Sequence, residues 1–254
     1  GGLGDVAGSL PQALRKRLIG ARVVMPLYDT ISQELKDTMK FVTSDSVPVA
    51  WRRQYCGIFE AKAGGVIYYL LDNQYYFKRD GLYGYYDDAE RFAFFARAVL
   101  EIIPHIDFKP DIIHCNDWQT GPLCAYLKEI YSHMLPYSKI KTLYTIHNLQ
   151  YQGRFAPSTL DMMGLPGWAW HNVEFYDSVS FMKMGLVYCD YISTVSETYA
   201  YEIQTSEYGY GMEGILRSRA DRLCGIINGI DFVANNPATD KHIVKHFDAA
   251  HPED

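Results

Sequence analysis

The sequence lacks three features that mark specialised classes of protein. None of its apolar runs approaches the roughly 20 residues of a membrane-spanning helix; VIYYLL at 66–71 is typical of their length. Its 24 lysines and arginines are outnumbered by 30 aspartates and glutamates, so it has no basic footprint for nucleic acid. Its five cysteines are odd in number and never spaced as CxxC, which disfavours a disulfide framework or a zinc site. We therefore expect no membrane, nucleic acid or metal as partner.

The compartment follows from the same absences. Scattered cysteines fit a reducing environment, and no signal-peptide pattern stands at the start of the sequence. We expect a cytoplasmic protein from a bacterium. Apolar residues make up 48% of the 254 residues, which is enough for a sizeable core. The 21 tyrosines offer flat faces and hydroxyls that suit sugars, although filling a core and its rim explains most of them.

Short apolar strands alternate with amphipathic helices from residue 111 onward. The pattern predicts strands at 111–116, 141–147, 191–196 and 223–228 and helices at 120–131, 178–190 and 198–205. Such alternation is typical of βαβ units and of a mostly parallel sheet covered on both faces. The expected fold class is therefore α/β with a doubly wound sheet.

The first half of the chain is less regular. A strand is predicted at 21–28, after an opening helix. Residues 47–72 indicate an antiparallel β insertion, whose turn falls at Ala63-Gly64-Gly65. A helix is predicted at 87–103, with Asp87 and Glu90 as its capping box.

The opening segment GGLGDV formally fits a glycine-rich phosphate loop leading into a helix. Glycines such as Gly2 and Gly4 let the backbone approach an anion, and the amides at a helix start are unpaired donors. The motif alone is weak, because a tight turn packed on a helix also favours glycine.

Polar side chains follow the predicted strands where each strand ends. Asp117 follows the strand at 111–116, His147 and Asn148 end the next, and Asn228 ends the last. Ligands of open α/β sheets bind beyond the carboxyl ends of the strands, so these side chains indicate a site that recognises hydroxyls. No carboxylate pair of a hydrolase and no G-x-S-x-G elbow is present.

Each of these residues also has a structural interpretation. His147 could be a core histidine whose hydrogen bonds are satisfied. Asp117 could in part cap the helix after it, and capping could be the whole role of Ser196. Asn228 with Gly229 could form only a tight turn.

Six motifs in this order and spacing resemble one known family. They are GGLGDV at the start, HCNDWQT at 114–120, YTIHNLQYQG at 144–153, STVSETYAYEI at 193–203, YGYGMEGIL at 208–216 and NGID at 228–231. The chain resembles the bacterial glycogen synthase and plant starch synthase family of ADP-glucose-dependent α-1,4-glucan glucosyltransferases from Gly1 to about Asp240.

The resemblance implies a GT-B type architecture, in which two Rossmann-like domains face each other across a cleft. Residues 1–240 would be the N-terminal, acceptor-side domain without its first strand and loop lysine. Residues 241–254 would be a tail leading toward an absent C-terminal domain, which in this family holds most of the nucleotide. On this interpretation the chain alone is inactive.

The resemblance also implies roles on the nucleotide-sugar side. Gly1, Gly2 and Gly4 would line the diphosphate of ADP-glucose. Asp5 would face the sugar or the acceptor, and Asn228 would contact the transferred glucose. No cofactor is implied.

On the acceptor side, His147 resembles the active-site histidine of the family, and Asp117 is expected to act with it. Trp118 and Asn148 resemble residues that bind the glucan, and Tyr83 matches an acceptor-site tyrosine. The family often has histidine where Asn116 and Gln119 stand here, which is a departure from its pattern.

The function that the resemblance implies is transfer of glucose to the non-reducing end of an α-1,4-glucan with retention of configuration. A non-catalytic glucan-binding module is the main alternative, supported by the aromatic content and the missing half. A nucleotide-dependent dehydrogenase is a third reading, supported by the glycine motif and by Asp29 after the second strand.

Overall fold

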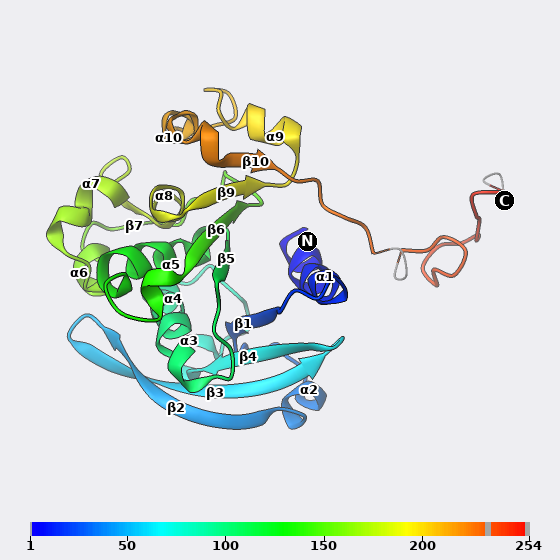
Figure 1. Cartoon of the computed structure of the whole chain (residues 1–254), viewed down its shortest axis with the longest axis horizontal. Coiled ribbons are helices and arrows are strands. Elements are labelled where there is room, and N and C mark those ends of the chain that lie inside the picture. The colour runs from blue at the N-terminus through cyan, green and yellow to red at the C-terminus, as the bar shows by residue number, and fades with distance from the viewer. Residues whose placement is uncertain (1, 232–234, 252–254) are drawn as a thin grey trace.

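The computed structural model describes residues 2–231 and 235–251, and it contains two four-stranded sheets (Figure 1). In the first sheet the strand order is β1 (Arg22–Pro26), β4 (Val66–Asp72), β3 (Arg52–Ala63) and β2 (Lys40–Val49). In the second the order is β10 (Leu223–Gly225), β9 (Tyr191–Thr194), β6 (Lys141–Ile146) and β5 (Ile112–Asn116). A two-stranded ribbon joins β7 (Arg154–Phe155) to β8 (Val179–Ser180). The α/β class is confirmed, but the parallel strands and the insertion do not form one continuous sheet.

The two larger sheets differ in the direction of their strands. In the second sheet all neighbours are parallel, as the βαβ alternation predicted. In the first, β1 pairs with β4 in parallel, whereas β2, β3 and β4 pair antiparallel. The β3–β4 turn consists of Gly64 and Gly65, with φ of +54° and +77°. A two-residue hairpin turn of this hand favours glycine at both positions, so the turn predicted here is confirmed.

The α-helices are short apart from two. They are α1 (Gly2–Lys16), α2 (Gln33–Asp37), α3 (Gln74–Phe77), α4 (Asp88–Glu101), α5 (Gly121–Tyr126), α6 (Thr159–Met163), α7 (Trp170–Val173), α8 (Phe181–Tyr188), α9 (Glu197–Glu202) and α10 (Glu213–Ser218). A π-helical turn at Leu127–Tyr131 continues α5, so together they occupy the range predicted as one helix. The last strand is shorter than predicted, because the chain leaves the sheet after Gly225 and exposes Ile226 and Ile227.

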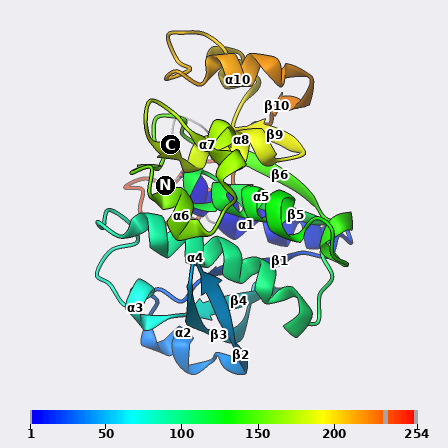
Figure 2. The ribbon, with the colours of Figure 1, turned by 90° about the vertical axis from the view of Figure 1, so that its left-hand side faces the viewer.

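The core lies around α4, which packs against β2 of the mixed sheet and against α5 of the parallel layer. Figures 1 and 2 both show α4 between the two sheets. On the parallel sheet, Cys115 and Tyr144 point toward α5 and α8, where Cys124 and Met182 contact them. The opposite face of the same strands is therefore left for polar side chains.

The capping box predicted for α4 is wrong. The Asp87 carboxylate makes no cap hydrogen bond and instead pairs with Arg79 at 2.8 Å. Glu90 accepts a hydrogen bond from the Tyr76 hydroxyl and pairs with Arg52 at 2.7 Å. A guanidinium within reach competes successfully with a backbone amide for a carboxylate, because both charges are then compensated.

Candidate active site

The carboxyl ends of β5 and β6 bring Asp117 and His147 together. One oxygen of Asp117 accepts hydrogen bonds from the main-chain amides of His147 at 2.7 Å and Asn148 at 3.4 Å. The Asp117 amide donates to the carbonyl of Thr145, so its backbone is fixed by β6 as well. Asp117 therefore clamps the turn that follows β6.

The backbone of Asp117 is strained. Its φ is +56°, a conformation that residues with a Cβ rarely adopt. Strain of this kind persists where the surrounding structure over-determines it, and such positions cluster at functional sites. The side chain does not cap the following turn, Trp118–Thr120, so the capping role considered for Asp117 is wrong.

The imidazole of His147 is held on one side only. Its Nε2 lies 3.0 Å from the Oδ1 of Asn116, the last residue of β5. Its Nδ1 is buried and has no hydrogen-bond partner among the residues that the structure describes. Burial lowers the pKa of His147, and the nearby Asp117 carboxylate opposes this without reversing it. The ring is therefore neutral at neutral pH.

The carboxyl group of Asp117 is shifted in the opposite direction. Burial raises its pKa above the usual range, while the hydrogen bond from the His147 amide and the positive charge of His147 in its protonated form act to lower it. A carboxyl and an imidazole that are both partly buried and lie side by side are the kind of pair that occurs in reactive sites.

A line of polar side chains crosses the sheet behind this pair. The Nε2 of His114 lies 2.6 Å from the Thr145 hydroxyl, which lies 2.6 Å from the hydroxyl of Ser193. Burial and the charge of His147 lower the pKa of His114 to about 4. This network was not predicted from the sequence. Its signal was the two-residue spacing on β5 and β6, which places 114 with 116 and 145 with 147 on one face.

The loop after His147 is fixed from several directions. The Asn148 side chain accepts a hydrogen bond from the Gln150 amide at 3.0 Å, closing a local turn. The Leu149 amide donates to the Tyr199 hydroxyl on α9 at 3.2 Å. Ser196 caps α9 by accepting from the Tyr199 amide, so its predicted capping role is confirmed. Tyr199 thus joins α9 to the turn that follows His147, a contact that sequence reasoning did not predict.

Trp118 lies in the core rather than on the surface. Its side chain is 9% exposed, and its ring centroid is 5.1 Å from that of Phe92 and 5.8 Å from that of Phe155. It also packs on Gly153, where a Cβ would lie 2.4 Å from the ring and where φ is +56°. In this position Trp118 supports the turn that carries Asp117 and offers little ring surface to a sugar.

Tyr83 lies apart from this pair, on the loop before α4. It is 60% exposed, and no hydrogen bond or ring contact among the described residues joins it to His147. The loop is anchored by the buried pair of Asp88 and Arg91, since the Gly84 amide donates to Asp88 at 2.6 Å. An exposed tyrosine on an anchored loop is available to a ligand.

The residues expected on the nucleotide side lie at the two ends of the chain. Gly2, Gly4 and Asp5 stand in the first turn of α1, so the helix begins where a glycine loop was predicted. Gly1 lies outside the described residues. Asn228 is exposed beyond β10. Figure 1 shows α1 starting on the side of the molecule toward which β9 and β10 run.

The described residues contain neither a helix that could span a membrane nor a cluster of metal-binding side chains. None of their helices has the length and apolar character that crossing a bilayer requires. They also contain no group of three or more histidine, cysteine, aspartate or glutamate side chains placed to hold a metal ion.

A parallel α/β sheet with a strained residue and partly buried polar side chains at its carboxyl edge is typical of the ligand-binding α/β domains. Within that class, the chain belongs to the starch synthase catalytic domain family, which it matches over residues 1–218. It is 55% identical over 243 residues to a glycogen synthase from Geobacillus stearothermophilus, covering 94% of this chain and 50% of that protein. It is 52% identical over 258 residues to one from Clostridium beijerinckii, covering 100% and 54%.

Among solved structures, the fold is similar to the catalytic domain of starch synthase IV from Arabidopsis thaliana bound to ADP and acarbose. The TM-score is 0.89 at 30% identity, covering 99% of this chain and 53% of that one. The chain thus has the fold of one half of a GT-B type catalytic domain, and it spans about half the length of the curated relatives it matches.

Proposed function

We propose that the chain is the acceptor-side half of a retaining glucosyltransferase that transfers glucose from ADP-glucose to the non-reducing end of an α-1,4-glucan. The family, the glycogen synthases among its relatives and the ADP and acarbose bound to its structural neighbour support this proposal. The observation that carries it is the clamped His147 turn at the joint end of β5 and β6.

In this proposal His147 and Asp117 are the catalytic residues. Positive charge develops at the anomeric carbon as the bond to the diphosphate breaks. A neutral His147 ring and its main-chain carbonyl stabilise that charge by dipoles that are already in place. Asp117 orients that carbonyl by accepting hydrogen bonds from the amides of His147 and Asn148, which lie on either side of it along the chain. The departing diphosphate takes the proton of the acceptor hydroxyl on the same face, which retains the configuration.

The remaining assignments follow the two sides of the reaction. Asn148 and Tyr83 bind the glucan, and Trp118 acts by supporting Asp117 from the core. For the nucleotide sugar the contacts are Gly1, Gly2, Gly4, Asp5 and Asn228. The second half, which the matched relatives have in addition, holds most of the nucleotide, and its closure excludes water as a competing acceptor. The proposed compartment is the bacterial cytoplasm.

Replacing His147 by alanine tests this function. The variant is made in a full-length protein, in which this chain is continued by the second half that the relatives carry. We expect transfer of radiolabelled glucose to glycogen to fall by at least about 100-fold, with an unchanged circular dichroism spectrum. The matched control is His171→Ala, an exposed histidine on α7, which should keep normal turnover. Turnover near wild type in His147→Ala would remove His147 from the reaction.

A further inference from the structure

Asn116 is the one side chain that contacts the His147 ring by a hydrogen bond among the described residues. It ends β5, and its Oδ1 lies 3.0 Å from His147 Nε2. An amide oxygen accepts hydrogen bonds and cannot donate them, so the contact requires a proton on Nε2.

The other ring nitrogen leads to the same tautomer. Nδ1 is buried without a partner among the described residues. A proton there would be a buried donor with nothing to bind, which costs more than a bare lone pair does. A fully protonated ring would add a buried charge to that unpaired donor. Both nitrogens therefore favour the neutral ring with its hydrogen on Nε2.

We propose that Asn116 is a positioning residue that holds His147 as the neutral Nε2–H tautomer beside the reacting sugar. The inference rests on the proposed function for its catalytic meaning. An imidazolium next to an anomeric carbon that gains positive charge would repel it, whereas a neutral ring does not. The amide of Asn116 is suited to this role, because a carboxylate in its place would stabilise the charged ring.

Few neighbouring groups influence the protonation of the His147 ring. Asp117 lies on the turn after β5 and favours a charged ring, while His114 on β5 opposes it when protonated. From α9, Tyr199 contacts the same turn through the Leu149 amide, and burial raises the pKa of its phenol, so it stays neutral. Asn116 adds no charge to this balance. Changing it to a carboxylate changes the balance by one full negative charge at 3.0 Å from the ring.

The test compares Asn116→Asp with wild type in the full-length protein. Histidine labelled with ¹⁵N reports the tautomer by NMR, and His147→Gln assigns the resonance. In wild type we expect a pyrrole-type Nε2 and a pyridine-type Nδ1 at neutral pH. In Asn116→Asp we expect His147 to titrate at higher pH. The kcat/KM of this variant should then fall about tenfold for each pH unit below the pKa of His147 and recover at alkaline pH.

Asn172→Asp is the matched control, because it makes the same change at an asparagine on α7 that binds Tyr188. It should leave the His147 resonances and the pH profile as in wild type. A wild-type ring that is charged or carries its proton on Nδ1 overturns the inference, as does a pH profile of Asn116→Asp parallel to wild type. The proposed function fails separately, if His147→Ala remains active whatever the tautomer.

Discussion

The strained backbone of Asp117 is explained by the hydrogen bonds that its side chain accepts. Its backbone is strained at a φ of +56°. Its buried carboxylate receives the amides of His147 and Asn148. A glycine would relieve the strain but would leave both amides without their acceptor. The clamp therefore explains why a residue with a Cβ occupies this position.

Two substitutions separate the clamp from the charge of Asp117. Asp117→Ala should lower the free energy of unfolding by about 1–3 kcal/mol, because two amides lose their acceptor. Asp117→Asn keeps an acceptor oxygen and should be at least as stable as wild type at neutral pH. The sign follows from the raised pKa: the folded protein loses stability as pH rises through the interval between the ordinary and the raised value. Urea unfolding at several pH values measures this, and equal losses in both variants would contradict it.

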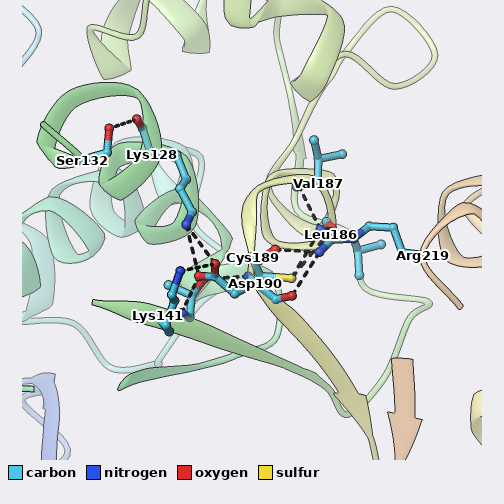
Figure 3. Close-up of polar contacts among 9 residues, drawn as sticks. Lys128, Ser132, Lys141, Leu186, Val187, Cys189, Asp190 and Arg219 are labelled. Atoms are coloured by element: carbon cyan, nitrogen blue, oxygen red, sulfur yellow. Dashed lines mark hydrogen bonds and ion pairs between the residues drawn. The ribbon is translucent and has the colours of Figure 1, made fainter. Parts of the chain in front are cut away.

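Ionic contacts and charged hydrogen bonds stabilise the junction between α8 and β9 (Figure 3). Asp190 directly precedes β9. Its carboxylate accepts a hydrogen bond from the amide of Thr142 at 2.8 Å and binds the ammonium of Lys128 at 3.1 Å. Lys141 lies 3.6 Å away. Arg219 donates to the last carbonyls of α8, reaching Leu186 at 2.5 Å, Val187 at 3.0 Å and Cys189 at 2.7 Å. These bonds satisfy groups that the end of a helix leaves unpaired.

Asp190→Asn should destabilise this junction by about 1–3 kcal/mol at neutral pH, since charged hydrogen bonds are lost. Burial acts to raise the pKa of Asp190, but the Thr142 amide and Lys128 outweigh it and the pKa is lowered. The stabilisation is therefore present above the ordinary pKa of an aspartate and is lost as pH falls through the lowered value. Thermal unfolding between neutral and acid pH should show this loss in wild type and a flatter dependence in Asp190→Asn. Asp161→Asn, an exposed aspartate on α6, is the control that should keep the wild-type slope.

Across the whole molecule, the candidate site lies on one edge of the parallel sheet. The turn that contains His147 and Asn148 lies at the ends of β5 and β6, whereas Tyr83 comes from the loop before α4, which packs against the mixed sheet. Gly2, Gly4 and Asp5 are exposed at the start of α1, and Asn228 is exposed beyond β10. In the proposed function, a domain built in this way forms the acceptor-side wall of the site.

Titration calorimetry of the 254-residue chain tests this division. We expect weak binding of maltooligosaccharide and little or no binding of ADP-glucose, because in the proposed function the second half holds most of the nucleotide. Adding the second half in a full-length protein should produce nucleotide binding. Tight binding of ADP-glucose by the chain alone would contradict the division, and glucan binding by a full-length protein without transfer would favour a non-catalytic glucan-binding module.

Local pattern in the sequence was sufficient to predict most of the helices and strands. Strand periodicity predicted β5, β6 and β9, and the glycine pair at 64 and 65 predicted the hairpin between β3 and β4. Ser196 was predicted as a cap because a cap needs only the amide three residues on. The position of His147 at a strand end was equally local. These features depend on neighbours in the chain, so the amino-acid order determines them.

Only the tertiary structure decided which partner each polar group takes. Asp87 and Glu90 have the spacing of a capping box, yet Arg79 and Arg52 lie within reach and take their charges. Asn116 meets His147 through the pairing of β5 with β6, across 31 positions of sequence. Periodicity assigns a side chain to a face, whereas its partner depends on the register of strands and on packing from distant segments. The sequence by itself therefore determined most of the elements and the family, and long-range packing decided how the turn that contains His147 is held.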